Sequence, residues 1–234
     1  MGLLNGCYFK KIKEANFGEI PKHNGWNVLL KKYVTKNGDV DYASFTKDKN
    51  TLDDYLNMLA NNPPAKNWTK NEKLSYYINL YNAGTVKLII ENYPLKSIKD
   101  INSPWGKKRL KIGKRRLSLG NLEHNMLRKM NEPRIHFAIN CASYSCPKLL
   151  NVAFTASEME EQLTQATKDF LSDRKRNKIT KEKAELSEIF KWFKGDFTAD
   201  GTLLEYINQY TEEKISNNTK IEYLDYNWSL NEAK

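Results

Sequence analysis

The chain has 234 residues, of which 40% are hydrophobic, and it carries a formal net charge of +10. This composition excludes an intrinsically disordered chain, and the length is sufficient for one large domain or two small ones. Its three cysteines are too few for a disulfide framework, and no apolar run approaches the roughly 20 residues of a membrane span. The totals therefore predict a soluble globular protein.

The N-terminal segment carries a signal that concerns cellular location. We expect residues 1–24 to form a flexible arm and residues 25–234 to form a single domain. Residues 3–7, LLNGC, resemble the lipobox of bacterial lipoproteins, although the apolar stretch that normally precedes a lipobox is missing. The expectation is a membrane tether through Cys7 and an extracytoplasmic location, in the periplasm or anchored as a lipoprotein. The alternative is a cytoplasmic protein.

The first third of the domain shows helical patterns. Residues 26–34 have apolar residues at helical spacing, and an Asn-Gly-Asp sequence predicts a turn into a short extended piece over 37–45. Residues 51–62 form an amphipathic pattern in which Thr51 is the expected N-cap. Pro63 marks the end of that helix, since proline disfavours helical backbone before it.

The strongest helical pattern covers residues 68–94. Thr69 and Glu72 have the spacing of a capping box, and Pro94 marks the end of the pattern. Apolar residues occur around most of this helix, which is typical of a central, buried element.

Further along the chain, short strands and helices follow one another. In chain order, the patterns predict a β-hairpin turning near Gly113 (108–119), a helix (118–130), a strand (133–143), a helix capped by Thr155 or Ser157 (155–173), a second hairpin (178–187), two helical segments (187–197 and 202–210) and an extended tail (221–231). Helices dominate, and the short strands are expected to pair antiparallel. The predicted fold class is α+β, mostly helical with a small antiparallel sheet.

Much of the positive charge lies in two runs, residues 107–116 and 168–183. We expect solvated lysine-rich faces and hairpin tips there. No aromatic residues alternate with the charges in the manner of nucleic-acid binding surfaces, so no nucleic-acid partner is expected. The alternative is that the 107–116 hairpin binds an anionic polymer or the cell envelope.

Several polar side chains occupy positions in apolar elements. Asn79 and Asn82 lie on the central helix, where each either ties a neighbouring loop to the helix or lines a substrate pocket. Glu123 and His124 are adjacent on the next helix and face different ways. His124 lies between apolar positions, so we expect it to point inward, as a core histidine or as a catalytic base.

The segment RIHFAINCASYSCP (134–147) is the expected functional centre. Strand alternation places His136 on one face and Cys141 on the other, at the end of the strand, where small residues allow a sharp turn. A cysteine nucleophile needs a thiolate, which a nearby imidazole stabilises. Other interpretations are a Cys141–Cys146 disulfide, a metal site that also uses His124 and His136, and plain buried cysteines. No cofactor is indicated.

Six segments together resemble a known family. They are WNVLLKKYVTKNGDVDYASF, YINLYNAGTVKLIIENYP, LSLGNLEHNMLR, EPRIHFAINCASYSCPKL, EIFKWFKGDF and the terminal YNWSLN. In this order they are similar to the bacterial form of the domain of unknown function 547 family (DUF547), over roughly residues 25–231. Some members resemble papain-like and transglutaminase-like cysteine hydrolases, which implies a divergent core of that kind. Many bacterial members carry export signals.

The resemblance also bears on the site residues. Plant relatives keep a cysteine that matches Cys141 and a histidine that matches His124, which favours these two over Cys146 and His136. In transglutaminase-like folds the nucleophile begins a central helix, and here that helix has no cysteine. The resemblance therefore implies either a site rebuilt around Cys141 or a domain that only binds.

We expect a cysteine-dependent hydrolase or acyl-transferase that acts on an amide or peptide-like bond. In this hypothesis Cys141 is the nucleophile, His124 the general base and His136 the alternative base, while Glu123 or Asn82 orients the imidazole and backbone amides near residues 142–143 hold the oxyanion. Substrate-binding residues would be Asn79, Asn82, Ser143 and Cys146. The rival hypothesis is a non-catalytic ligand- or protein-binding module of the cell envelope.

Overall fold

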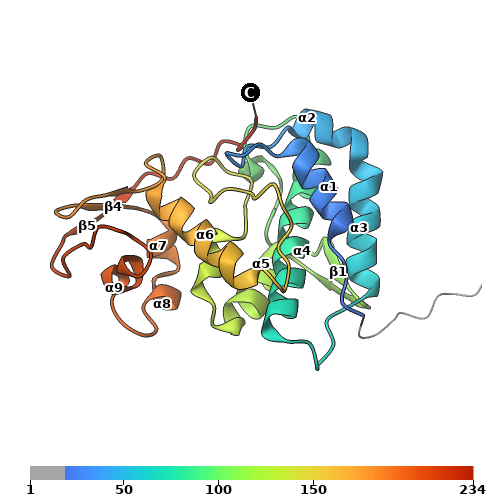
Figure 1. The fold of residues 1–234 in the computed structure, drawn as a ribbon. Helices are drawn as coiled ribbons and strands as arrows, with labels where there is room; N and C mark the ends of the chain where they lie inside the picture. The colour runs from blue at the N-terminus through green and yellow to red at the C-terminus, as the bar shows by residue number, and fades with distance from the viewer. Residues whose placement is uncertain (1–18, 234) are drawn as a thin grey trace, which may run out of the picture.

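A computed structural model describes residues 19–233 of the chain and shows an α+β fold that is mostly helical (Figure 1). Its α-helices are α1 (Asn24–Tyr33), α2 (Tyr42–Phe45), α3 (Lys49–Asn61), α4 (Lys70–Ile90), α5 (Leu119–Leu122), α6 (Met159–Ser172), α7 (Ile189–Trp192), α8 (Lys194–Phe197) and α9 (Leu203–Asn208). Its strands are β1 (Leu110–Ile112), β2 (Arg115–Leu117), β3 (Lys178–Ile179), β4 (Ala184–Ser187) and β5 (Ile221–Leu224). The predicted fold class is confirmed.

The strands form two small sheets. The β1–β2 hairpin is antiparallel, and Gly113 supplies the left-handed residue of its turn with φ +55°. The β3–β4 hairpin is also antiparallel, but β5 pairs parallel with β4. The expectation of antiparallel strands alone was therefore wrong for β5. The reason is the connection, because α7 to α9 lie between β4 and β5 and carry the chain back to the start of the sheet.

Helix α4 is the central element of the fold. Its predicted capping box is confirmed, because the Thr69 hydroxyl accepts from the Glu72 amide and the Glu72 carboxylate accepts from the Thr69 amide. Apart from Tyr77 and Lys87, every residue from Leu74 to Ile90 is buried, which explains why its apolar residues surround the helix. In Figure 1, α4 lies between α6 and α3.

The apolar residues of the described chain form two cores. The larger core contains residues of α1 to α5 and the first half of α6, and the smaller contains the second half of α6, β4 and α7 to α9. In Figure 1 the elements of the smaller core lie on the side of α6 away from α1 and α3. Between the cores runs the 3₁₀ helix η5 (Pro133–Phe137), in which Ile135 packs in the larger core and Phe137 in the smaller.

The strand predicted over 133–143 was wrong. Residues 133–137 form η5, and an irregular loop follows. Pro133 begins the helix, and the Glu132 side chain accepts a hydrogen bond from the Arg134 amide. Residues 135–140 are all buried, and such a short apolar run has no periodicity that separates a strand from a buried turn of helix.

The start of the domain also differs in detail from the pattern. The turn near Gly38 is confirmed, with φ +84° at that residue, but the extended piece ends at Val40. Tyr42–Phe45 is instead the short helix α2, because the Asp41 carboxylate caps it by accepting from the Ser44 amide at 2.9 Å.

Two other helix starts were placed wrongly. Helix α3 begins at Lys49 after a 3₁₀ turn, so Thr51 lies inside the helix and is not its N-cap. Helix α6 begins at Met159 with Glu158 in the N-cap position. The Thr155 hydroxyl instead accepts from the Glu158 amide in the turn that precedes α6.

The predicted arm lies mostly outside the described residues. Residues 1–18, with Cys7 among them, are not described, so the tether and the extracytoplasmic location stay predictions. Within the described part of the arm, His23 is buried and its Nδ1 lies 2.7 Å from the Tyr55 hydroxyl. None of the helices between residues 19 and 233 is long and apolar enough to cross a membrane.

Asn79 ties the segment before α6 to the central helix. Its amide nitrogen donates to the carbonyl oxygens of Ser75 and Phe154, and its amide oxygen accepts from the Phe154 N–H at 3.1 Å. The side chain is fully buried. This is the loop-tying role that the sequence left open as one of two alternatives.

Replacing Asn79 by alanine should destabilise the fold. Asn79→Ala leaves the buried N–H and carbonyl of Phe154 without these partners, and the expected loss in free energy of unfolding is on the order of 3 kcal/mol. Urea unfolding followed by circular dichroism measures it. Asn92→Ala, the same change at the exposed end of α4, is the control and should cost under about 1 kcal/mol. Equal losses in the two variants would contradict the assignment.

Candidate functional site

A pocket of about 290 Å³ lies where the two cores meet. Its lining residues are Tyr81, Trp105, Glu123, His124, His136, Ile139, Cys141, Cys146, Pro147, Ile189, Trp192, Phe193, Tyr226 and Trp228. The structure therefore brings together five of the predicted site residues, namely Glu123, His124, His136, Cys141 and Cys146. Asn79, Asn82 and Ser143 are not among the lining residues.

The loop that carries Cys141 is held by two buried asparagines. The Asn82 amide nitrogen donates to the Ala138 carbonyl at 2.9 Å, and its amide oxygen accepts from the Asn140 N–H at 2.8 Å. Asn140 in turn donates to the Pro147 carbonyl and accepts from the Ala142 N–H. Side-chain amides thus replace the strand neighbours that this segment lacks.

The turn after Cys141 is unusual because Ala142 has φ +59° and is completely buried. A non-glycine residue in the left-handed region is strained, and such strain persists only where the surroundings fix it. The Asn140 side chain provides that restraint through the Ala142 N–H. The predicted sharp turn at this position is present. The same bond occupies one of the backbone amides that we expected to hold an oxyanion.

The Cys141 thiol is half-buried and has three polar neighbours. Its Sγ lies 2.8 Å from Cys146 Sγ, 3.2 Å from the Ser143 hydroxyl and 3.4 Å from the Tyr226 hydroxyl. The hydrogen bond from Cys146, together with those from Ser143 and Tyr226, outweighs burial and lowers the pKa of Cys141 below its ordinary value. A lowered pKa increases the thiolate fraction, and the thiolate is the nucleophilic form.

Cys146 lies beneath Cys141 and is only 3% exposed. Its sulfur accepts the Cys141 backbone N–H at 2.9 Å. Burial, with the neighbouring Cys141 sulfur, raises the pKa of Cys146 well above its ordinary value. Both cysteines are free in this structure, so it does not contain the disulfide that the sequence left open.

Tyr226 reaches the site from the C-terminal tail and was missed by the sequence interpretation. Its hydroxyl lies 2.8 Å from the Ser143 hydroxyl as well as beside Cys141 Sγ. Burial and the two sulfurs raise the pKa of Tyr226 well above its ordinary value, so it remains a hydrogen-bond donor at neutral pH. The tail is fixed by backbone bonds, in which the Tyr144 amide donates to Ser229 and the Ser145 amide to Asn227.

His136 is paired with an acid that the sequence interpretation also missed. His136 Nε2 lies 2.8 Å from the Asp196 carboxylate, which also accepts two hydrogen bonds from the Arg128 guanidinium. Burial alone would raise the pKa of Asp196, but the bonds from Arg128 and His136 hold it well below its usual range. The ring of Phe193 stacks on His136 with centroids 4.0 Å apart. The only signal was the Asp in the EIFKWFKGDF segment, 60 residues from His136.

His124 is exposed at the rim of the pocket, so the expectation that it points inward was wrong. Residues 118–130 are helical as predicted, but η3 (Glu123–Leu127) is a π-helical turn, in which the Arg128 amide donates to the Glu123 carbonyl. This wider turn buries Glu123 and turns His124 outward. The Nδ1 atom of His124 lies 3.2 Å from the Arg128 guanidinium.

Glu123 faces the pocket and accepts a hydrogen bond from the buried Tyr81 hydroxyl at 3.2 Å. Burial and this carboxylate raise the pKa of Tyr81 well above its ordinary value. Between residues 19 and 233, neither Glu123 nor Asn82 hydrogen-bonds to an imidazole, and Asp196 is the carboxylate that contacts one. Neither of the two predicted orienting contacts is therefore present among these residues.

No hydrogen bond joins the Cys141 thiol to an imidazole within the described part of the chain. A proton leaving the sulfur must therefore cross the pocket through water or a bound substrate. Nor does a group of three or more His, Cys, Asp or Glu side chains form a possible metal site among residues 19–233. The metal site that combined both histidines with both cysteines is thus not formed here.

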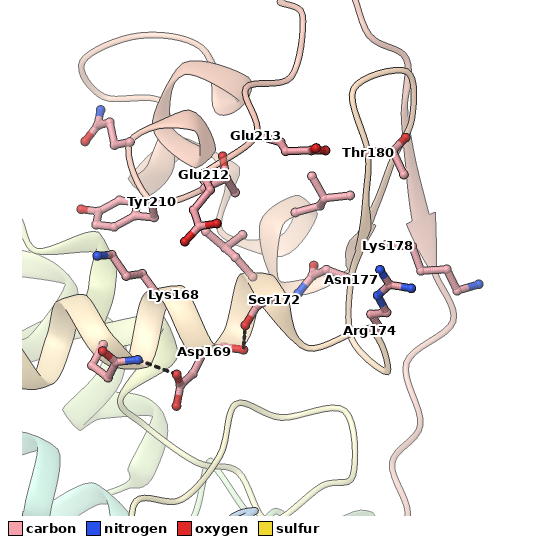
Figure 2. A pocket seen from close by; sticks show the side chains of 15 residues that line it. Lys168, Asp169, Ser172, Arg174, Asn177, Lys178, Thr180, Tyr210, Glu212 and Glu213 are labelled. Carbon is pink, nitrogen blue, oxygen red and sulfur yellow. Dashed lines mark hydrogen bonds between the residues drawn. The ribbon is translucent and has the colours of Figure 1, made fainter.

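A larger hollow of about 970 Å³ lies between α6, the β3–β4 hairpin and residues 209–213. Figure 2 shows Lys168, Arg174 and Lys178 of the second basic run around it, together with the carboxylates of Glu212 and Glu213. The lining therefore carries charges of both signs, and it includes neither a thiol nor an imidazole. Cys141, Cys146, His124 and His136 lie in the smaller pocket.

Removing the Tyr226 hydroxyl should weaken the thiolate of Cys141. In Tyr226→Phe the thiolate loses a donor, so the pH midpoint of alkylation by iodoacetamide should move to higher pH. The measurement is the alkylation rate against pH in a Cys7→Ser background, so that Cys7 does not contribute. Tyr144→Phe is the matched control on the same loop, since its exposed ring has no hydroxyl contact with Cys141. A midpoint that is unchanged in Tyr226→Phe would contradict the assigned contact.

Asp196 should make the stability of the fold depend on pH. In the unfolded chain the Asp196 carboxyl has a pKa of about 3.9, whereas in the folded protein its pKa is lowered and the carboxylate stays ionised to lower pH. Its contribution is therefore complete above about pH 4 and is lost as the pH falls through the folded pKa. Asp196→Asn should lose on the order of 2 kcal/mol at neutral pH and much less in acid.

Urea unfolding at several pH values measures this difference. Asp200→Asn is the control, because Asp200 is exposed and follows α8, the helix that contains Asp196. This variant should unfold like the parent at every pH. A loss in Asp196→Asn that is the same at neutral and acidic pH would count against the ion pair as its cause.

Residues 65–171 match the family model described as "Protein of unknown function, DUF547". No curated protein and no solved structure matches the chain. The papain-like or transglutaminase-like core accordingly stays a prediction. The matched segment contains α4, η3, η5 and both site cysteines, while Asp196 and Tyr226 lie beyond it. The predicted resemblance is thus confirmed over these residues, which are similar to a family whose function is unknown.

Proposed function

We propose that the protein is a cysteine-dependent hydrolase or acyl-transferase that acts on an amide or peptide-like bond. The observation that carries this proposal is the pocket of about 290 Å³, which is lined by a thiol of lowered pKa and by His136, a histidine paired with the Asp196 carboxylate. Thiol, imidazole and acid are the components of cysteine acyl-transfer sites on unrelated folds. In this mechanism the Cys141 sulfur attacks the substrate carbonyl carbon and forms a thioester as the amine leaves.

His136 is the better-supported general base of the two candidates. Asp196 fixes its Nε2 and stabilises the imidazolium that forms when the ring takes up a proton. His124, by contrast, is exposed at the rim, its Nδ1 contacts the Arg128 guanidinium, and no carboxylate orients it among the described residues. The proton passes from Cys141 through a pocket water to His136, and then to the leaving amine. Water attack on the thioester gives hydrolysis, and amine attack gives transfer.

The Tyr226 hydroxyl is suited to hold the oxyanion. Tyr226 lines the pocket beside the Cys141 sulfur, where the carbonyl oxygen of an attacked substrate would develop charge, and the buried Ser143 hydroxyl lies 2.8 Å behind it. This replaces the Ala142 amide of the sequence hypothesis, because Asn140 already occupies that amide.

The substrate specificity we infer is for an apolar or aromatic flank. Trp192 stacks on Trp228 with centroids 5.7 Å apart, and Trp105 meets Trp228 edge to face at the same centroid distance. Such an aromatic wall beside a thiol suits a peptide-like substrate with an apolar side chain next to the reacting carbonyl.

The test is acylation by an activated ester of an N-acetylated aromatic amino acid, followed by intact mass and by release of the alcohol. The parent should form a thioester on Cys141 and turn it over, and Cys141→Ser should lose this adduct. His136→Gln should reduce turnover by about 100-fold or more, the typical contribution of a general base. His124→Gln is the matched variant, with the same change at the rim, and should fall by less than about threefold.

Two outcomes would contradict the proposal. One is a parent that forms no adduct on Cys141 although a small alkylating reagent modifies that residue. The other is equal turnover in His136→Gln and the parent, which would remove His136 from the mechanism.

A second candidate is the non-catalytic binding module, and the aromatic wall favours it. In that case the pocket holds an apolar ligand group without a covalent step. N-acetyltryptophan amide should then bind with equal affinity to the parent and to Cys141→Ser in isothermal titration calorimetry, while neither forms an adduct with the ester. Thioester formation on Cys141 in the parent would exclude this alternative.

A further inference from the structure

The two site cysteines form a close but unequal pair. Their sulfur atoms lie 2.8 Å apart, and both thiols are free. Cys141 is half-buried and lines the pocket, whereas Cys146 is only 3% exposed and lies beneath it. An acyl-transfer reaction needs one thiol, so the mechanism above gives Cys146 only a supporting hydrogen bond.

The loop between the cysteines is fixed in the conformation that brings the sulfurs together. The Cys146 amide donates to the Ser143 carbonyl at 3.0 Å, which closes the turn. From outside the loop, the Arg176 guanidinium donates to the carbonyl oxygens of Cys146 and Tyr144 at 2.6 and 2.9 Å. Because these bonds already hold the sulfurs in contact, a bond between them requires little movement of the backbone.

The pair also has the division of roles that thiol–disulfide exchange requires. The outer thiol faces the pocket and has hydroxyl donors on its sulfur, so it is the attacking thiolate. The inner thiol is kept protonated by burial, which raises the pKa of Cys146, and it is sheltered from reagents in solution. It reacts only with a sulfur that is already bound to Cys141.

We propose that Cys141 and Cys146 form a dithiol that reduces a disulfide entering the pocket. The activity is separate from the acyl transfer proposed above and does not depend on it. The substrate class is a small-molecule or peptide disulfide, and the aromatic side chains of Trp192 and Trp228 give an apolar flanking group a surface to lie on.

The reaction proceeds in two exchange steps. The Cys141 thiolate attacks one sulfur of the substrate, which breaks the substrate S–S bond, forms a mixed disulfide and releases the first thiolate. Cys146 then gives up its proton to that thiolate, and its sulfur attacks Cys141 Sγ. The second substrate thiolate leaves as the Cys141–Cys146 bond forms. The protein loses two electrons and the substrate gains two, and a dithiol reductant returns the pair to its reduced form.

The test uses the full chain with Cys7→Ser and 4,4′-dithiodipyridine, a neutral aromatic disulfide whose thiopyridone product absorbs light. This protein should release about two thiopyridones per chain, because the second thiol completes the exchange. Mass spectrometry should show no adduct, a loss of two hydrogens and, after chymotryptic cleavage at Tyr144, a linked pair of peptides that contain Cys141 and Cys146. Because these linked peptides come from a protein with both site cysteines unchanged, this result does not depend on whether any site variant folds.

Two further variants in the same background assign the roles. Cys146→Ser should release about one thiopyridone and keep the thiopyridyl adduct on Cys141, since serine accepts the Cys141 amide but cannot exchange. Cys141→Ser should react at least about 100-fold more slowly than the parent, because Cys146 is shielded from solvent. Circular dichroism verifies that both variants fold.

The proposal is overturned if the parent site retains thiopyridyl adducts on both cysteines, or if Cys146→Ser gives the stoichiometry of the parent. Thiopyridone release does not require acyl turnover, and ester turnover does not require a second thiol. A protein that exchanges disulfides without forming a thioester therefore refutes only the proposed function, and the reverse result refutes only this inference.

Discussion

The carboxamide of Asn82 is the contact on which the site depends. Both ends of this side chain bond to the backbone of the segment that leads to Cys141, one to the Ala138 carbonyl and one to the Asn140 amide. Without it, two buried polar groups would lose their partners, and leaving such groups unpaired costs on the order of 1–3 kcal/mol each. The buried central helix thus fixes the position of the reactive loop, and the loop has no need of a sheet to support it.

The two cores explain why the pocket lies where it does. Ile135 and Phe137 are only two residues apart, yet they pack in different cores. Helix η5 therefore joins the two cores, and the loop that follows it lies along their junction. One side of the pocket comes from α4 and η3, and the other from α7 and the residue that follows it. Any small change in how the cores pack would alter the distance from Cys141 to the aromatic wall and to His136.

Much of the fold could be predicted from local signals. The Thr69–Glu72 capping box, the Gly113 hairpin and the helical patterns depend on residues close in sequence, and the structure contains each of them. The strand at 133–143 was wrong because burial on all sides removes the periodicity that distinguishes a strand. In its place the backbone pairs with side chains from far along the chain, which no local pattern encodes.

The candidate site was predicted in part for the same reason. Cys141, His136 and Glu123 were found because thiol, imidazole and carboxylate groups are conspicuous in apolar segments, and they do line one pocket. Asp196 and Tyr226 complete the site from 60 and 85 positions away from their partners. Their segments were visible as parts of the family resemblance, but their contacts depend on how the smaller core folds back. The outward position of His124 follows from a single π turn, which sequence spacing does not reveal.

The return of the C-terminal tail also has a consequence for the order of folding. Cys141 and Tyr226 belong to segments that are made at different times during synthesis, and their contact closes a loop that spans 85 positions of the chain. Until that loop closes, the thiol lacks this donor and is not covered by the tail. The chemical character of Cys141 is therefore acquired late, and a thiol-reactive reagent added during refolding would report when the last segment docks, independently of secondary structure.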